Sequence, residues 1–271
     1  MREWDGAVAF ITGGAQGIGL GIARALGKRG VRLAVVDIDE EALGRCGDEL
    51  GEVGEVEVYR LDVRDRAAFA SVADEVEGRF GGVDLLFNNA GVVPYSAVSE
   101  LGYEKWDLAL GINVVGVVNG IQTFLPRMIG RGRGGYVVNT ASGAGLVADA
   151  NVLYVTTKFA VVGLSESLRL ALEGHGIDVS VLCPGPVDTG IVRNTRALDE
   201  SAFTGLSDSA VQGVEAFLKS GVSIDEVGEM VVAGMEARSA WIHTDAVVRT
   251  HVEQRMTAIL DSIPVPAAGT P

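Results

Sequence analysis

Residues that bind metals, form disulfides or attract polyanions are scarce in this sequence. Only two of its 271 residues are cysteine, Cys46 and Cys183, and they lie far apart, without the spacing of metal ligands. Lysine and arginine together number 22 against 36 acidic residues, which gives a net charge of −14. A charge of this sign opposes binding to nucleic acid or to an anionic membrane surface. We therefore expect no metal site, no nucleic-acid partner and the reduced thiols of a cytoplasmic protein.

Long hydrophobic segments are also missing, so we expect no membrane partner. Residues 1–6 are polar and lack the apolar core of a signal peptide. The most apolar internal stretch, residues 108–121, contains Asn113 and Asn119 and is too short to span a bilayer. The composition is otherwise that of a globular protein, with 48% hydrophobic and 21% charged residues. A chain of this length suits one large α/β domain with a well-buried core.

Short apolar runs recur along the chain and predict the strands of a parallel sheet. Most are continuous rather than alternating, as expected for strands that are covered on both faces. Valine, isoleucine and leucine dominate them. The predicted strands are residues 7–12, 31–37, 56–61, 83–88, 136–141, 178–183 and 240–243.

Helical patterns fill the gaps between these strands. Apolar residues recur on one face of residues 17–30, Asp65 can cap a helix over residues 66–80, and Ser223 with Glu226 forms a capping box before residues 227–237. Such alternation predicts right-handed crossovers and a doubly wound α/β fold, a parallel sheet of about seven strands with helices on both faces. We expect a single domain over residues 1–263, a flexible tail at 264–271, and a functional lid at 187–223, where no strand pattern is visible.

A glycine-rich turn joins the first predicted strand to the first predicted helix. Gly13, Gly17 and Gly19 surround Gln16 and Ile18 in this turn. Glycines allow the backbone to approach a pyrophosphate closely, and the following helix offers free N–H groups to the phosphates. Taken alone the glycines indicate only a tight turn; their place between strand and helix favours a nucleotide site.

Asp37 ends the second predicted strand, where a carboxylate accepts hydrogen bonds from an adenosine ribose and repels a 2′-phosphate. Neither Gln16 nor Ile38 supplies the positive charge that such a phosphate requires. This favours NAD over NADP; the alternative is a solvated acid at a strand end. Turns after the third and fourth strands place further candidates near the cofactor, and these are Asp62, Val63, Asn89, Ala90 and Gly91.

Tyr154 and Lys158 stand four residues apart, on one face of a predicted helix. Hydride transfer to a ketone needs a proton donor and the reverse reaction needs a base, and a nearby cation lowers the pKa of a tyrosine toward that role. Ser142 follows the fifth strand and can donate a hydrogen bond to a substrate oxygen, while Asn113 can hold a water linking Lys158 to solvent. Taken separately, Tyr154 and Lys158 suit helix packing, Ser142 suits a helix cap and Asn113 suits a core amide. Their order along the chain, after a nucleotide motif, favours a reaction centre.

As a set, these motifs resemble the short-chain dehydrogenase/reductase family, in its shorter single-domain branch, from about residue 5 to 243. The resemblance implies a Rossmann-type fold, NAD as cofactor, and a catalytic tetrad of Asn113, Ser142, Tyr154 and Lys158. It implies that Tyr154 and Lys158 also contact the cofactor and that residues 184–189 hold the nicotinamide, through Pro184, Gly185, Val187 and Thr189. Family members are commonly dimers or tetramers built through helices that here would span residues 103–128 and 154–173.

The residues expected around the substrate are mostly apolar. They belong to residues 92–97, 143–153 and the lid, and they indicate a hydrophobic secondary alcohol or ketone. Arg193 and Arg196 in the lid either clamp a substrate carboxylate or face solvent. Two other functions remain open: an idle NAD-binding sensor or scaffold, and a different reaction on the same fold, such as epimerisation or dehydration.

Overall fold

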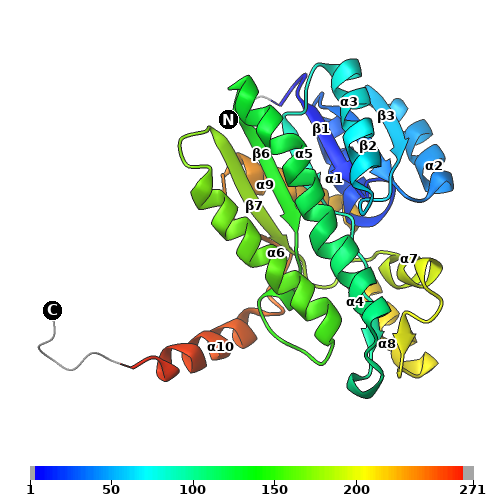
Figure 1. The fold of residues 1–271 in the computed structure, drawn as a ribbon, viewed down its shortest axis with the longest axis vertical. Helices are drawn as coiled ribbons and strands as arrows, with labels where there is room; N and C mark the ends of the chain where they lie inside the picture. Colours follow the sequence, from blue (N-terminus) through cyan, green and yellow to red (C-terminus); the bar gives the residue numbers. More distant parts are fainter. Residues whose placement is uncertain (1–3, 265–271) are drawn as a thin grey trace, which may run out of the picture.

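Seven parallel strands form the central sheet of the computed structural model, which describes residues 4–264 (Figure 1). Their order across the sheet is β3-β2-β1-β4-β6-β7-β9. This confirms the doubly wound parallel sheet, and each strand begins and ends within two residues of its predicted bounds. The strands are β1 (Val8–Thr12), β2 (Arg32–Asp37), β3 (Val56–Arg60), β4 (Leu85–Asn88), β6 (Gly135–Thr140), β7 (Ile177–Cys183) and β9 (Trp241–His243).

Helices cover both faces of this sheet because its strands are apolar on both sides. β1 sends Ala9 and Ile11 into one core and Val8 and Phe10 into the other. The first core is closed by α1 (Gly17–Gly27), α2 (Glu40–Gly51) and α9 (Ile224–Glu236). The second is closed by α3 (Arg66–Phe80) and α5 (Gly116–Arg131), and α6 (Val152–Ala171) covers the sheet beside α5.

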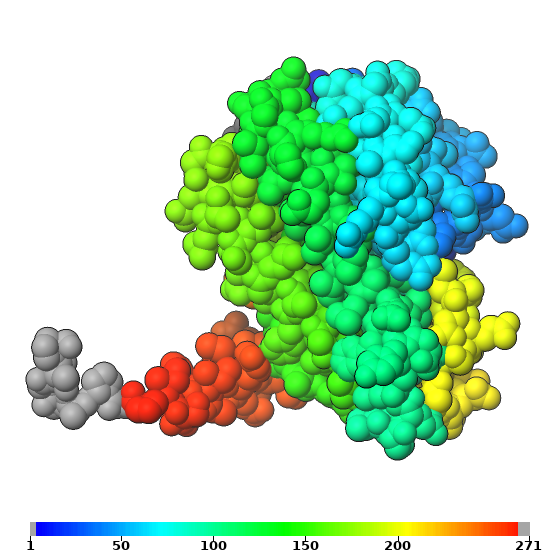
Figure 2. All heavy atoms as spheres, viewed as in Figure 1, coloured from blue at the N-terminus to red at the C-terminus, as the bar shows by residue number. Residues whose placement is uncertain are grey.

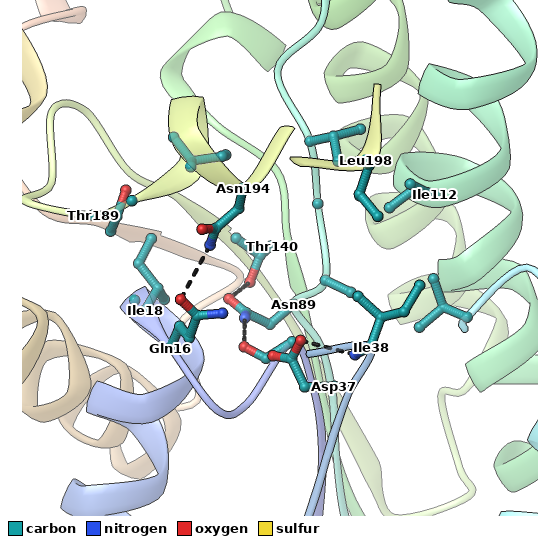
Figure 3. A pocket seen from close by; sticks show the side chains of 18 of the residues that line it. Gln16, Ile18, Asp37, Ile38, Asn89, Ile112, Thr140, Thr189, Asn194 and Leu198 are labelled. Carbon is teal, nitrogen blue, oxygen red and sulfur yellow. Dashed lines mark hydrogen bonds between the residues drawn. The ribbon is translucent and has the colours of Figure 1, made fainter. Parts of the chain in front are cut away.

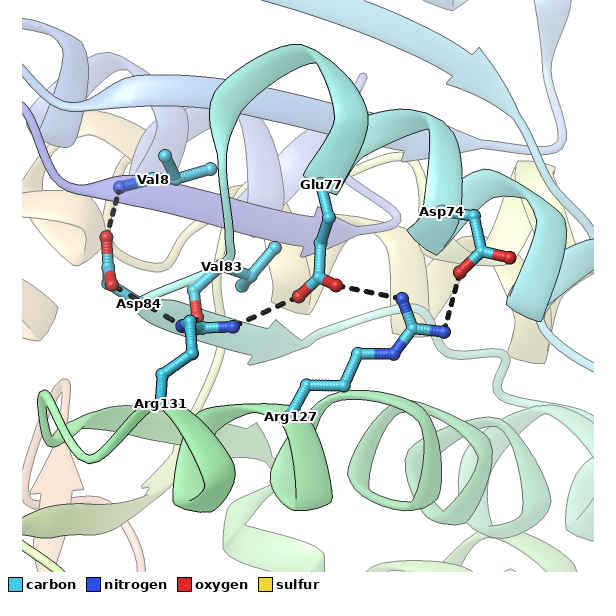
Figure 4. Close-up of polar contacts among 7 residues, drawn as sticks. All are labelled: Val8, Asp74, Glu77, Val83, Asp84, Arg127 and Arg131. Carbon is cyan, nitrogen blue, oxygen red and sulfur yellow. Dashed lines mark hydrogen bonds and ion pairs between the residues drawn. The ribbon is translucent and has the colours of Figure 1, made fainter.

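The predicted helix caps are present. Asp65 accepts hydrogen bonds from the amides of Ala67 and Ala68 at the start of α3. Ser223 and Glu226 form the reciprocal capping box, and α9 begins at Ile224, three residues before the predicted start. Ion pairs then join α3 to α5: Glu77 contacts both Arg127 and Arg131 (Figure 4).

The helix expected over residues 103–128 is interrupted and longer than predicted. α4 (Tyr103–Leu110) runs through a π-helical turn, Gly111–Val115, into α5, which ends at Arg131. Among the described residues, only this 29-residue run is long and apolar enough to cross a membrane, and 56% of its most apolar window is buried inside the protein. It packs against α3, α6 and β4, as a core helix does.

The lid predicted as irregular contains regular structure. It holds α7 (Ile191–Leu198), β8 (Phe203–Thr204) and α8 (Asp208–Lys219), and β8 pairs with β5 (Tyr95–Ser96) in a separate two-stranded sheet. The chain also forms a helix that the sequence analysis did not identify, α10 (Arg249–Ser262), which extends away from the body (Figure 2). The tail expected at 264–271 lies outside the described residues, apart from Pro264.

Strand register brings polar strand ends to one edge of the sheet. Thr12 pairs with Val36, and Asn88 pairs with Asn139, so the residues that follow these positions leave the sheet side by side. From β1 the strand order continues outward through β2 and β3, and from β4 it continues in the opposite direction through β6, β7 and β9. Parallel sheets bind ligands at such a switch point, outside the carboxyl ends of the strands.

The close packing of α9 against α1 requires glycine at the contact, and substitutions can test this requirement. A Cβ on Gly228 of α9 would overlap the carbonyl group of Gly21 in α1, whereas a Cβ on exposed Gly213 of α8 would meet no atom within 4 Å. Gly228→Ala should therefore lower the free energy of unfolding by about 1–3 kcal/mol. The control Gly213→Ala should raise it by about 0.5–1 kcal/mol, because alanine favours helix.

Urea unfolding followed by circular dichroism measures both changes. Equal stability of the two variants would contradict the backbone contact between α1 and α9.

Candidate active site

One cavity of about 380 Å³ lies at this edge of the sheet. It brings together fourteen of the residues singled out from the sequence, which are Gly13, Gln16, Gly17, Ile18, Asp37, Asp62, Val63, Asn89, Ala90, Gly91, Tyr154, Lys158, Pro184 and Thr189. Figure 3 shows side chains from the turn before α1, the end of β2 and the lid facing one another across it. A cavity of this size is in the range of small-molecule sites.

The glycine-rich turn forms one wall of the cavity. Gly13 has φ +60°, and a Cβ there would lie 2.8 Å from the Cα of Ala90, so only glycine fits. Gln16, at the N-cap position of α1, directs its side chain to Asp39 at 3.1 Å instead of capping the helix. The first-turn N–H groups of α1 therefore lack a side-chain cap and are available to an anion.

The ends of β1, β4 and β6 are joined through Asn89. Its side-chain amide donates to the carbonyl oxygens of Thr12 and Gly13, at 3.2 and 3.1 Å, and its side-chain oxygen accepts from Thr140 at 3.2 Å. The Thr12 hydroxyl accepts from the amides of Asn89 and Ala90. These contacts hold the nucleotide turn against the centre of the sheet.

Two carboxylates lie at the β2 end of the cavity. Asp37 accepts hydrogen bonds from the amides of Ala15, Ile38 and Asp39, and burial raises the pKa of its carboxyl group. Asp39 also lines the cavity, which the sequence analysis missed although Asp39 stands only two positions after Asp37. Asp62 lines the cavity too, but its carboxylate pairs with Arg64 at 2.6 Å.

Tyr154 and Lys158 face the cavity from α6, as predicted. The Lys158 ammonium lies 5.4 Å from the centre of the Tyr154 ring and donates to the carbonyl oxygen of Thr140 at 3.1 Å. Only 3% of Lys158 is exposed, which rules out the alternative of a surface helix pair. Ser142 lies near enough to the Tyr154 hydroxyl to lower its pKa slightly against the effect of burial, and its oxygen accepts a hydrogen bond from the amide of Ala144.

Burial, rather than the lysine, dominates the ionisation of this pair. It raises the pKa of Tyr154 to about 12 and lowers the pKa of Lys158 to about 8. Burial therefore opposes the lowering of the tyrosine pKa that the sequence analysis expects from Lys158. The physical reason is that the low-polarity surroundings of the buried Lys158 and the half-buried Tyr154 penalise the ammonium and the phenolate alike.

Asn113 lies in the π-helical turn and is buried, but its side chain already has partners. Its oxygen accepts from the amide of Val92 at 2.8 Å, and its nitrogen donates to the Val92 carbonyl and the Thr157 hydroxyl. The side chain fixes the strand end beside Lys158. Among the described residues the Asn113 oxygen accepts one hydrogen bond, so it can still accept from a water, and the water link to Lys158 stays a prediction.

Some predicted residues do not line the cavity in the part of the chain that the structure describes. They are Gly19, Asn113, Ser142, Gly185, Val187 and the segment 143–153. A Cβ on Gly19 would overlap the carbonyl of Gly13, so this glycine permits the turn to close on α1. Val187 is 2% exposed and forms a bridge with Val222, so its side chain belongs to the core. The amide of Gly185 donates to Thr244.

The lid contributes lining residues that the sequence analysis missed. Ile191, Asn194 and Leu198 of α7 face the cavity, and their spacing of three and four positions is the available signal. Neither arginine considered for a carboxylate clamp or a solvent-facing role lines the cavity: Arg193 contacts Gln16 and Arg196 lies over the Phe203 ring. Among residues 4–264, no cluster of three or more histidine, cysteine or acidic side chains could hold a metal ion.

The family model for short chain dehydrogenases matches residues 7–200, and the chain belongs to this family of oxidoreductases. A short chain dehydrogenase/reductase from Burkholderia phymatum, solved in complex with NAD, superposes with a TM-score of 0.91 over 100% of both chains at 33% identity. C alpha-dehydrogenase from Sphingobium sp. is 34% identical over 97% of this chain and 88% of its own length. Sorbitol dehydrogenase from Cereibacter sphaeroides is 39% identical over 68% of this chain and 72% of its own.

Asp37→Ala should narrow the preference for NADH over NADPH by about tenfold or more, because the buried carboxylate no longer repels a 2′-phosphate. Fluorescence titration of the two cofactors gives the ratio of their dissociation constants. Asp62→Asn is the control, since Arg64 already neutralises that carboxylate, and it should leave the ratio unchanged. An unaltered ratio in Asp37→Ala would show that Asp37 does not face the ribose.

Proposed function

We propose that this protein is an NAD-dependent oxidoreductase that interconverts a hydrophobic secondary alcohol and its ketone, with Tyr154 as the general acid and base. One observation carries the proposal. A single cavity joins the glycine-rich turn and Asp37 at one end to Tyr154 and Lys158 at the other. A dinucleotide bound along it would have its phosphates at α1 and its reactive end beside the tyrosine.

The residues present fit NAD. The uncapped first turn of α1 suits a pyrophosphate, and Gly13 removes the Cβ that would crowd the turn. Asp37 and Asp39 place two carboxylates where a 2′-phosphate would have to lie, which favours NAD over NADP. When bound, NAD supplies the acceptor or donor of the hydride. Pro184 and Thr189 would hold its nicotinamide end.

Tyr154 donates a proton to the substrate oxygen in one direction of the reaction and accepts it in the other. Its raised pKa keeps the phenol protonated at neutral pH, so it is ready to donate to the oxygen of a ketone that receives hydride. In alcohol oxidation the phenol must first lose its proton, and the Lys158 ammonium on the same helix face favours the phenolate that results. Ser142 lies beside the phenolic hydroxyl and favours the phenolate, since it lowers the pKa of Tyr154 against the effect of burial.

Apolar side chains form part of the cavity wall. They include Val92, Ile112, Ile191, Ala197 and Leu198. Such a wall suits a hydrophobic alcohol better than a polyol, whose hydroxyls would lose water without gaining partners. Among the relatives, C alpha-dehydrogenase matches nearly the whole chain, whereas sorbitol dehydrogenase matches 68% of it.

We also propose a homodimer or homotetramer, in the cytoplasm as the low cysteine content predicts. Exposed apolar side chains on α4 and α6 support an assembly through these helices, and they include Tyr103 at 87% and Leu170 at 68% exposure. Surfaces of this kind are common where copies of a chain associate.

Tyr154→Phe should reduce turnover by about 10²–10⁴-fold, because the ring remains and only the transferable proton is lost. NADH affinity should be unchanged. Tyr59→Phe, on β3 and outside the cavity, is the matched control and should turn over as the wild type does. Turnover is measured by NADH absorbance with a panel of secondary alcohols. A rate near that of the wild type in Tyr154→Phe would show that Tyr154 is not the acid–base residue.

The two directions should respond differently to pH. Since the pKa of Tyr154 is raised, the phenolate fraction is small at neutral pH and increases as pH rises. Alcohol oxidation should therefore accelerate by up to about tenfold per pH unit until another step limits it, whereas ketone reduction should stay nearly constant over the same range. Lys158→Ala should move the oxidation profile to still higher pH. A flat oxidation profile in the wild type would contradict this assignment.

A further inference from the structure

α4 contains a lysine that the proposed chemistry does not use. Lys105 is 4% exposed, although unpaired lysines are rarely buried so fully. Its ammonium lies 2.5 Å from a carboxylate oxygen of Asp199, and it also donates to the Ser201 hydroxyl. Asp199 in turn accepts from the amide and the hydroxyl of Ser201. The buried charge is therefore both paired and hydrogen-bonded.

This ion pair joins two walls of the cavity. Lys105 lies about two helical turns before Ile112, in the continuous run of α4 and the π-helical turn. Asp199 directly follows Leu198, at the C-terminal end of α7. Ile112 and Leu198 both line the cavity, and Figure 3 shows them at the same end of it. In Figure 2 the lid lies against the surface of α4.

Other contacts fix α7 on the same side. Thr195 is fully buried, and its hydroxyl accepts from the amide of Val93 at 3.0 Å. The amide of Tyr95 donates to the carbonyl of Ala202 at 2.7 Å, within the pairing of β5 and β8. These contacts connect α7 and the start of β8 to the segment after β4. Only the Lys105–Asp199 pair connects the end of α7 to α4 by charge in the described residues.

We propose that Lys105 is a positioning residue, which holds α7 over the β2 end of the cavity, on the side of Ile38, through its buried ion pair with Asp199. This rests on the proposed function, since it assigns the β2 end to the adenosine half of NAD. Lys105 does not line the cavity and acts only by setting the separation of Ile112 and Leu198. Removing the cation frees the end of α7, because Asp199 is partly exposed and is then solvated by water.

Lys105→Met tests the proposal, since it keeps the apolar stem and removes the charge. The dissociation constant of NADH should rise by about tenfold or more, because small misplacements of binding groups are costly. The KM of the alcohol at saturating NAD should not change. Asp199→Asn in the Lys105→Met background should add little, since both variants break one interaction.

Glu77→Gln is the matched control. It breaks the two ion pairs of Glu77 with α5, at a partly buried site that does not line the cavity (Figure 4). It should lower the unfolding temperature and leave the dissociation constant of NADH unchanged. A dissociation constant that is unchanged in Lys105→Met, or raised equally in Glu77→Gln, would overturn the proposal.

Hydrogen exchange gives a second readout that needs no substrate. In Lys105→Met the amides of α7 should exchange about tenfold faster or more, while those of α1 and α9 keep the wild-type rate. Unchanged exchange in α7 would overturn the proposal. If the wild-type protein itself neither binds NADH nor oxidises any alcohol, the proposed function fails, and exchange in α7 still decides whether Lys105 holds the lid.

Discussion

The hydrogen bonds of Asn89 and Thr140 connect both halves of the candidate active site. Asn89 binds the carbonyl groups of Thr12 and Gly13 on one side and the Thr140 hydroxyl on the other. The carbonyl of Thr140 then accepts from Lys158. These hydrogen bonds therefore fix the turn that fits a pyrophosphate relative to the helix that carries Tyr154, at the place where three parallel strands end. A displacement there would separate cofactor from acid–base residue.

Burial decides the chemistry at this point as much as residue identity does. With Lys158 buried and Tyr154 half-buried at the cavity wall, the phenol holds its proton more firmly and the ammonium loses its proton more readily than in solution. The resting pair is therefore poised to give a proton to a substrate oxygen. Apolar side chains such as Val92 and Ile191 line the same cavity, and they disfavour ligands that need many hydrogen-bond partners there.

The sequence predicts those features that are local. The strands can be predicted because both of their faces are buried and their sequences are therefore continuously apolar. The α3 and α9 caps can be predicted because Asp65 and Ser223 stand at fixed spacing from the helices they cap, and the nucleotide turn because its glycines lie close together in the chain. Features that depend on distant partners are not visible. α7 is held by Val93 and Lys105, about a hundred residues away in the chain, so its helix was missed. The inward orientation of Val187 and the raised pKa of Tyr154 likewise arise from packing.

The central claim is that one cavity binds NAD with its reactive end beside Tyr154. Titration of the purified protein with NADH and NADPH, followed by cofactor fluorescence, tests it most directly when the same sample is then given NAD and a panel of hydrophobic secondary alcohols. The account predicts saturable binding that is tighter for NADH, and NADH formation with at least one alcohol. Failure to bind either cofactor would contradict the assignment of the glycine-rich turn and the chemistry built on it.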